Sequence, residues 1–220
     1  MVLGNSPQAE KIAVMNNVKN TERELSPEKT EAILRGAMQE FLEHGYAGAR
    51  IDKIVEAAGV SKATLYRHFA DKEALFTVLI QQMATETCVF QQQQNSPLLL
   101  EEPAVFLKQY ADKMLDNVEQ NPQRLTLLRI IIGDSGRFPE LAKVFVQNIE
   151  KPNLDFLTQY FATHPKLQIA DPEFTARMFI GTLVHFVIVR DLLHGKEVVP
   201  MDRDRLVEGL LDLVIYKTEC

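Results

Sequence analysis

Apolar residues recur at three- and four-residue spacing along most of the chain, as in helices that bury one face. The first clear run, Ile33 to Leu42, follows Ser26-Pro27-Glu28, which combines a capping Ser, a first-turn Pro and an early acid. The ten glycines and ten prolines fall mostly at the ends of such runs. The pattern therefore predicts an all-α protein.

Two short helical patterns separated by one sharp turn occupy residues 50–69. The first presents four apolar side chains to a core: Ile51, Ile54, Val55 and Ala58. Gly59 suits the left-handed conformation that ends a helix, and Ser61 is placed to cap the next one. Val60 and Leu65 have the spacing of a hydrophobic staple. Together these signals predict a helix-turn-helix.

The second helix of this motif has an assorted polar outer face, while Leu65 and Phe69 share its apolar face. Arg forks onto guanine, Ala and Thr touch the thymine methyl, and Lys, Tyr and His hold phosphates. The DNA-binding candidates are Arg50, Ser61, Lys62, Ala63, Thr64, Tyr66, Arg67, His68 and Lys72. A solvated polar face in an unrelated helical protein is the alternative that periodicity leaves open.

The residues from Ser26 to Phe76 resemble the DNA-binding domain of the tetracycline-repressor (TetR) family of bacterial transcription regulators. Four segments carry the resemblance: Phe41–Tyr46 at the end of the family's first helix, Ile54–Val60 in its second helix and turn, Ser61–Phe69 in its recognition helix, and Asp71–Phe76 at the start of its fourth. The resemblance implies a three-helix DNA-binding domain followed by a larger helical effector and dimerisation domain.

The sequence leaves two further possible DNA contacts undecided, at Arg50 and in the N-terminal tail. Where the family usually has Thr or Ser before its second helix, this chain has Ala49-Arg50. Arg50 cannot cap a helix, so it either reaches a phosphate or is solvated. Residues 1–25 are expected to form a tail, whose Lys11, Lys19 and Arg23 either contact DNA as an arm or belong to a solvated extension.

The sequence predicts a domain boundary on the helix that starts at Asp71. We expect a tail over 1–25, a DNA-binding domain over 26–95 and a ligand-binding and dimerisation domain over 96–220. Residues Leu127–Ala142 resemble the C-terminal domain of the AefR-like branch of the same family. Pro152 is expected to kink or split the helical pattern that begins near Pro139.

A helix opened by Asp171-Pro172-Glu173 is apolar almost all round from Met178 to Val189. This run is too short to span a bilayer and too apolar to face water, so it should be buried on two sides. With the last helix, from about Met201 to Tyr216, it predicts half of a four-helix homodimer interface. The interface candidates are Leu183, Phe186, Val187, Leu206, Leu210 and Leu213. The alternative is that both helices complete the core of a monomer.

Aromatic residues with few polar neighbours concentrate in the C-terminal half, which favours an apolar pocket for a small hydrophobic effector. The effector-binding candidates are Phe106, Tyr110, Met114, Leu128, Phe145, Phe179 and His185. For each of them a plain core position is the alternative, and a lone His on an apolar helix also suits a hydrogen-bonded core residue.

Composition narrows the class of protein. A net charge of −6 argues against a general polyanion binder, but the segment 50–72 carries a local +2, from Arg50, Lys53, Lys62, Arg67 and Lys72 against Asp52, Glu56 and Asp71. Cys88 and Cys220 form neither a disulfide framework nor a metal spacing, and the N-terminus lacks a signal core. We expect a cytoplasmic protein without a membrane span, metal or cofactor.

These observations predict a ligand-responsive homodimer, most simply a repressor released from near-palindromic double-stranded operator DNA by its effector. Two other classes of protein are the alternatives: a helical adaptor that binds only protein, and an enzyme on a helical scaffold. No catalytic residue is proposed, because the chain has no GxGxxG, P-loop, His-Glu-x-x-His or Cys-x-x-Cys motif.

Overall fold

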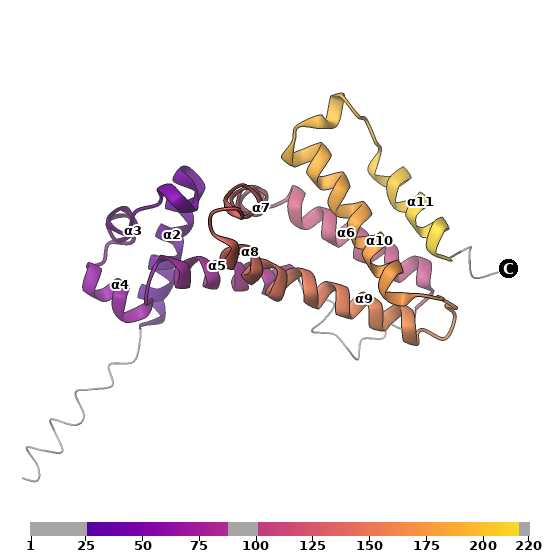
Figure 1. The fold of residues 1–220 in the computed structure, drawn as a ribbon, viewed down its shortest axis with the longest axis horizontal. Helices are drawn as coiled ribbons and strands as arrows, with labels where there is room; N and C mark the ends of the chain where they lie inside the picture. The colour runs from indigo at the N-terminus through magenta and orange to yellow at the C-terminus, as the bar shows by residue number, and fades with distance from the viewer. Residues whose placement is uncertain (1–25, 88–100, 216–220) are drawn as a thin grey trace, which may run out of the picture.

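The computed structural model describes residues 26–87 and 101–215, and every regular element in these two ranges is a helix (Figure 1). The expected all-α class is therefore confirmed. Several expectations concern residues outside the described ranges: the tail with Lys11, Lys19 and Arg23, the two cysteines Cys88 and Cys220, and the boundary between residues 95 and 96.

The N-terminal part consists of α2 (Pro27–Gly48), α3 (Ile51–Ala58), α4 (Lys62–His68) and α5 (Lys72–Thr87). Local signals fix its helix ends as expected. The Ser26 hydroxyl accepts a hydrogen bond from Lys29 N, and the Ser61 hydroxyl accepts one from Thr64 N at 3.1 Å. Gly59 has a φ of 64° and ends α3, and Gly45 has a φ of 68° and kinks α2 near its end. The helix-turn-helix is thus formed by α3 and α4.

The helices α2 and α3 approach closely at Gly36. A Cβ atom added at this glycine would lie 2.9 Å from the carbonyl oxygen of Ile54 and 3.2 Å from the backbone nitrogen of Ala58. No side chain fits in that space. The absence of a side chain at Gly36 therefore lets α2 brace the first helix of the helix-turn-helix.

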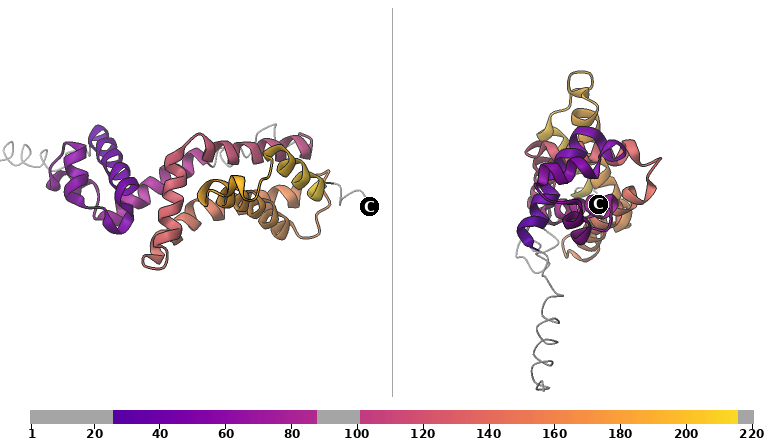
Figure 2. Two further views of the ribbon diagram at one scale, coloured as in Figure 1. Left: turned by 90° about the horizontal axis from the view of Figure 1, so that it is seen from above. Right: turned by 90° about the vertical axis from the view of Figure 1, so that its left-hand side faces the viewer.

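The C-terminal part consists of nine helical segments: α6 (Pro103–Glu119), α7 (Pro122–Asp134), α8 (Pro139–Phe145), η3 (Val146–Glu150), α9 (Lys151–Thr163), α10 (Pro172–Val187), η4 (Ile188–Leu192), η5 (Gly195–Glu197) and α11 (Arg203–Ile215), counted within the described ranges. The molecule is elongated, with the helix-turn-helix at one end and α11 towards the other (Figure 2). In Figure 1, α7 is seen nearly end-on between the two parts.

The buried apolar side chains form two clusters that do not divide at the end of α5. The first cluster joins the N-terminal helices to α7, α8 and η3, through residues such as Leu127, Ile131 and Leu141. The second cluster joins α6, α9, α10 and α11 around Phe106, Phe179 and other fully buried residues. The helices α7 and α8 therefore share one core with α2, α3, α4 and α5.

Tyr46, near the end of α2, is the aromatic joint between these parts. Its ring centroid lies 5.7 Å from that of Phe41, 5.4 Å from that of Phe76 and 4.9 Å from that of Phe138, which precedes α8. Aromatic pairs in such geometries stabilise a core beyond their buried area. The joint therefore fixes α2 and α5 against the turn between α7 and α8.

Pro152 was expected to kink or split a helix, and the structure shows how the chain accommodates it. The helix continues from α8 into α9 through η3, a π-helical turn in which Lys151 N donates to Val146 O. Pro152 falls in the first turn of α9, directly after this π-helical turn, so the chain accommodates a residue without a backbone N–H while the helix continues.

The helix α10 begins after the Asp171 cap, as the sequence predicts, and continues directly into η4. Together with η4 it runs over Pro172–Leu192, whose 21 residues have the length and composition of a membrane-crossing helix, which corrects the expectation of a run too short to span a bilayer. The difference arises because the helix includes residues on both sides of the apolar run from Met178 to Val189. One face of this helix packs against α6, α9 and α11 in the second cluster, with Ala176, Phe179, Ile180 and Leu183 buried. A core helix of a soluble protein can have the same length and composition.

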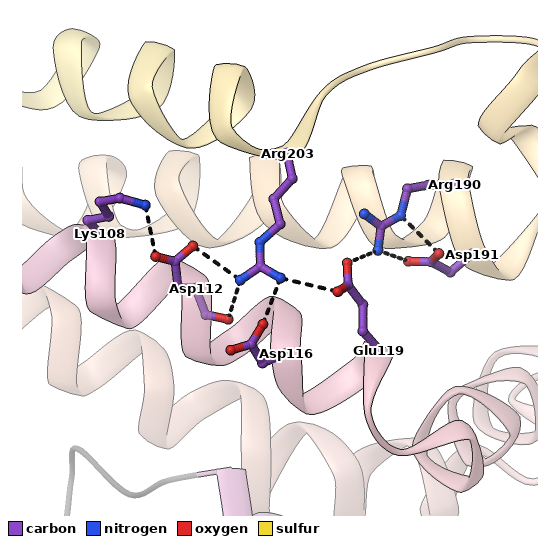
Figure 3. Close-up of polar contacts among 7 residues, drawn as sticks. All are labelled: Lys108, Asp112, Asp116, Glu119, Arg190, Asp191 and Arg203. Carbon is purple, nitrogen blue, oxygen red and sulfur yellow. Dashed lines mark hydrogen bonds and ion pairs between the residues drawn. The ribbon is translucent and has the colours of Figure 1, made fainter.

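A polar network joins α6, η4 and α11 (Figure 3). The guanidinium of Arg203 contacts Asp112, Asp116 and Glu119 of α6 at 3.1, 2.6 and 3.2 Å. Arg190 pairs with Glu119 and Asp191. Figure 3 shows the Glu119 carboxylate between the two guanidinium groups. The network therefore anchors the start of α11 to α6.

The same network affects the pKa of Asp112. Burial opposes the ionisation of this carboxyl, but hydrogen bonds from Lys108 and Arg203 outweigh it and lower the pKa below its usual value. A depressed pKa in the folded state stabilises the protein above the unfolded value of about 4. That contribution is lost as the pH falls through the folded pKa.

The close approach at Gly36 can be tested with two glycine substitutions. Gly36→Ala is expected to lower the free energy of unfolding by about 1–3 kcal/mol, because the methyl group forces α2 and α3 apart. Gly133→Ala in α7 is the matched control, since its Cβ would meet no atom within 4 Å. It should leave stability unchanged or raise it by about 0.5–1 kcal/mol. Urea unfolding measures both, and equal effects would contradict the close approach.

Arg203→Met should lower the free energy of unfolding by about 1–3 kcal/mol, because it keeps the aliphatic stem but removes hydrogen bonds to three carboxylates. Arg35→Met is the control, because its ion pair with Glu31 is exposed and is expected to contribute under about 0.5 kcal/mol. The deficit of Arg203→Met should shrink as the pH falls from 7 to 3 and the carboxyl groups protonate. A deficit that stays constant over this range would argue against the network.

Candidate functional site

The outer face of α4 is the exposed polar surface of the helix-turn-helix. Leu65 is fully buried beneath it, while Ala63 and Arg67 are exposed and Tyr66 has 52% of its surface exposed. The Ser61 hydroxyl, which caps the helix, also lies 3.0 Å from the Thr64 hydroxyl. The short helix is therefore held from its buried side and its start, and its outer side chains are open to a partner.

Asp52 of α3 lies close to two of the candidate phosphate-binding cations, Lys62 and Arg50. Its carboxylate forms an ion pair with the Lys62 ammonium and lies 4.0 Å from the Arg50 guanidinium. The hydrogen bond from Lys62 is the main cause of the lowered pKa of Asp52. All three side chains are more than half exposed. Since exposed ion pairs are weak, both cations can exchange this carboxylate for a phosphate.

His68 points inward rather than to the outer face of α4. Its Nδ1 lies 2.8 Å from the Thr30 hydroxyl of α2, and its Nε2 is buried. Burial, with smaller effects of Arg67 and Lys29, lowers the pKa of His68 below 6.5. This geometry suits a neutral side chain that joins α4 to α2, so it does not favour the phosphate contact expected from the sequence.

Lys72 is also used within the domain. Its ammonium donates hydrogen bonds to the carbonyl oxygens of Tyr46 at 2.7 Å and Ala49 at 3.1 Å, and it lies 4.7 Å from the centroid of the Tyr46 ring. Burial lowers the pKa of this ammonium. Two of its three N–H groups therefore hold the link between α2 and α3, and at most one remains for a phosphate.

Glu40 is a site residue that sequence reasoning missed. Arg50 stands at the N-cap of α3 without a side-chain cap, and its backbone N–H donates to Glu40 Oε1 at 3.0 Å. Glu40 is buried in α2, where its other carboxylate oxygen lies 3.4 Å from His44 Nδ1. No local motif could have indicated this contact, because it joins residues ten positions apart across two helices.

A cavity of about 390 Å³ lies where the two hydrophobic clusters meet. It is lined by Ile131, Phe145 and Ile149 from the first cluster and by Tyr110, Ile180 and Val187 from the second. Met83 of α5 also lines it. The cavity is therefore in contact with helices of both parts of the molecule.

Four of the candidate effector residues line this cavity: Tyr110, Met114, Leu128 and Phe145. Three others lie elsewhere. Phe106 and Phe179 are fully buried in the second cluster, and His185 is exposed on the outer side of α10. All seven candidates therefore lie on helices that contribute to the cavity wall, but three of them face elsewhere, because α6 and α10 are apolar on more than one face.

The polar lining of the cavity was largely missed by sequence reasoning. The Tyr110 hydroxyl donates to Asn153 Oδ1 at 3.1 Å, and Asn153 Nδ2 donates to Ile149 O at 2.9 Å. Five further polar side chains line the cavity: Lys113, Asn117, Arg124, Ser135 and Glu150. Burial raises the pKa of Glu150, against the opposing effect of Arg177. These residues were missed because polar residues are frequent in their segments, and helical periodicity alone does not indicate which of them face a cavity.

Most of the candidate dimer residues lie inside the subunit. Leu183, Phe186, Val187 and Leu210 are buried in the second cluster, and Leu206 is half-buried, whereas Leu213 has 55% of its surface exposed. The exposed side of α10 instead carries Phe174, which is 65% exposed, Gly181 and His185. The buried candidates therefore pack against helices of their own chain, and the exposed side of α10 carries other residues.

The described residues contain no group of three or more His, Cys, Asp or Glu side chains that could hold a metal ion.

Two family models match the chain. The model of bacterial regulatory proteins of the tetR family matches residues 33–79, which include α3 and α4. The model of the AefR-like transcriptional repressor C-terminal domain matches residues 106–216, half of the chain. Both resemblances seen in the sequence are therefore confirmed.

Comparison with individual proteins also finds transcriptional repressors. The chain is 40% identical over 67 residues to the HTH-type transcriptional repressor AcnR of Corynebacterium diphtheriae, an alignment that covers 30% of this chain but 34% of the relative. It thus spans about a third of that relative's length.

Solved structures match over more of the chain. A TetR-family regulator from Mesorhizobium loti superposes with a TM-score of 0.69 at 23% identity, over 86% of this chain and 98% of the other. The flavonoid-responsive regulator FrrA superposes with a TM-score of 0.68 at 28% identity, over 87% and 97%. With both family models matched and the whole fold shared, the chain belongs to the tetR family of bacterial regulatory proteins, with a C-terminal domain of the AefR-like type.

Proposed function

We propose that the protein is a homodimeric transcriptional repressor that binds a near-palindromic operator and is released from it by a small hydrophobic effector. The observation that carries the proposal is the exposed face of α4, held rigidly by the Ser61 cap and buried Leu65. We divide the chain into a DNA-binding domain over 26–95 and a ligand-binding and dimerisation domain over 96–220.

In this proposal two α4 helices enter successive major grooves about one helical turn apart. Arg67 reads a base, Ala63 and Thr64 contact the bases through their methyl groups, and Tyr66 contacts the backbone. Lys62 and Arg50 hold phosphates after exchanging Asp52, whose carboxylate is their present neighbour. His68 and Lys72 act by positioning α4 and the start of α3, since both are engaged with α2.

The dimer forms through the outer faces of α10 and α11. Phe174, Gly181 and His185 follow one another on α10 at helical spacing, and Leu213 of α11 is exposed as well. Exposed Phe and Leu side chains on neighbouring helices are suited to a partner subunit, and small residues such as Gly181 allow helices to approach closely. Leu183, Phe186, Val187 and Leu210 support this surface from beneath.

The effector binds in the 390 Å³ cavity and acts on DNA binding through the helices that line it. Met83 of α5 and Ile131 of α7 line the cavity and also belong to the core of the DNA-binding helices. A ligand that fits better when these helices are displaced shifts the dimer to a shape with a different spacing of α4. The similarity to FrrA, described as flavonoid-responsive, supports a hydrophobic effector.

The repressor proposal is tested by selecting binding sites from randomised DNA and measuring binding to the DNA around the protein's own gene. Arg67→Ala should cost roughly 1–3 kcal/mol and relax specificity at one position in each half-site. Lys62→Ala should weaken binding to all sequences alike and lower the dependence on salt concentration. Equal losses on all sequences for both variants would assign Arg67 to a phosphate, and the absence of any sequence-specific complex would refute the proposal.

Asp52→Asn is the matched control for this pair, because it removes the carboxylate that holds Lys62 and leaves both cations in place. It should strengthen binding to all sequences and steepen the salt dependence.

The dimer surface is tested by Phe174→Glu and Leu213→Glu, measured by analytical ultracentrifugation of the full chain. Each places a charge on the proposed apolar interface and should shift the equilibrium towards monomer by more than about tenfold in Kd. Val105→Glu is the control, because Val105 is also exposed but lies on α6. Dimers that resist both substitutions would place the interface elsewhere.

A further inference from the structure

The cavity carries chemical information about its ligand beyond its apolar character. Three residues with hydrogen-bond donors line it from the C-terminal half of α6 and the first turn of α7. Lys113 and Asn117 are four residues apart and so share a face of α6, and Arg124 stands in the first turn of α7. All three side chains line the cavity.

Asn117 has a buried side-chain donor at the cavity. Its side-chain nitrogen is buried and has no hydrogen-bond partner among the described residues. A buried amide without a partner costs about 1–3 kcal/mol, so the position favours a ligand atom that accepts a hydrogen bond.

Arg124 places a buried positive charge at the cavity. Only 8% of its surface is exposed, although a guanidinium is always charged. A buried cation is stabilised by an anion, and a guanidinium has five N–H groups, so it can bind an anion in addition to the contacts it already makes. Lys113 adds a second positive charge to the same wall.

Glu150 is an acidic residue of the cavity wall. Its carboxyl lines the cavity from η3, and Arg177 is the opposing charge that acts on it. A ligand anion is repelled by this carboxylate and attracted by the cations of α6 and α7. The charged group therefore belongs at the corner of α6 and α7, and the ligand body belongs among Leu128, Phe145 and Ile180.

We propose that the effector is an amphipathic organic acid, with an apolar body and a carboxylate or phenolate that binds Lys113, Asn117 and Arg124. This inference rests on the proposed effector role of the cavity and names the chemical class that the cavity selects. A lipophilic amine meets two like charges at this corner, and a neutral analogue loses the charge-assisted hydrogen bonds.

The test compares matched probes on the full-length protein by calorimetry at pH 7.5. The probes are 2-naphthoate and dodecanoate, each with its primary amide and with the amine of the same carbon skeleton. At least one carboxylate should bind about tenfold or more tightly than its amide, and its amine should bind more weakly still. If neither carboxylate binds more tightly than its amide, the proposal is wrong.

Substitutions of the lining residues test which side chains cause the preference for a carboxylate over its amide. Arg124→Met and Lys113→Met should each reduce carboxylate affinity about tenfold and leave amide affinity unchanged, so that amide binding also verifies the fold. Asn117→Leu should weaken both the carboxylate and the amide. Lys143→Met is the charge-matched control, because Lys143 is exposed and pairs with Glu140 outside the cavity. A carboxylate preference that survives both cation substitutions would overturn the assignment.

The outcome is separable from that of the repressor proposal. DNA binding of the same preparations is measured without any probe. A chain that binds its operator but prefers amides or amines refutes the acid class alone, whereas a chain that forms no specific DNA complex refutes the repressor proposal whatever its ligand preference.

Discussion

The packing of Tyr46 is the constraint on which the arrangement of the molecule depends. Its ring meets Phe41 and Phe76 of the DNA-binding helices and Phe138 between α7 and α8, while Lys72 lies over it and holds its carbonyl. Because aromatic rings in a close-packed core cannot move independently, the orientation of α2 and α5 is tied to that of α7 and α8. A change in the C-terminal helices therefore reaches the DNA-binding helices through packing.

The domain around this joint uses part of its positive surface for its own construction. His68 and Lys72 stand among the residues that face DNA by sequence position, yet both bind atoms of α2. Glu40 completes the arrangement by accepting the backbone N–H of Arg50, where the usual capping side chain is missing. The polar groups left for a partner are those on the outer face of α4 and around Asp52.

The cavity and the polar network occupy opposite sides of the same helix. On α6, Lys113 and Asn117 face the cavity, while Asp112, Asp116 and Glu119 bind the arginines of α11 and η4 (Figure 3). An effector that displaces α6 therefore acts on the anchor of α11, a helix of the proposed dimer surface. The two π-helical turns, η3 and η4, both contribute lining residues.

The sequence by itself determined the helices, their caps and the family, because a capping Ser, a left-handed Gly and helical periodicity act over a few residues. Its candidate effector residues lie on four of the helices that line the cavity, α6, α7, α8 and α10. Only the tertiary structure decided which faces are used: Phe179 and Leu183 went to the core, and His185 and Phe174 to the surface. A helix that is apolar all round does not specify its orientation through its own pattern. The helices packed against it determine that orientation. Contacts such as that of Glu40 with Arg50 form only when the two helices meet.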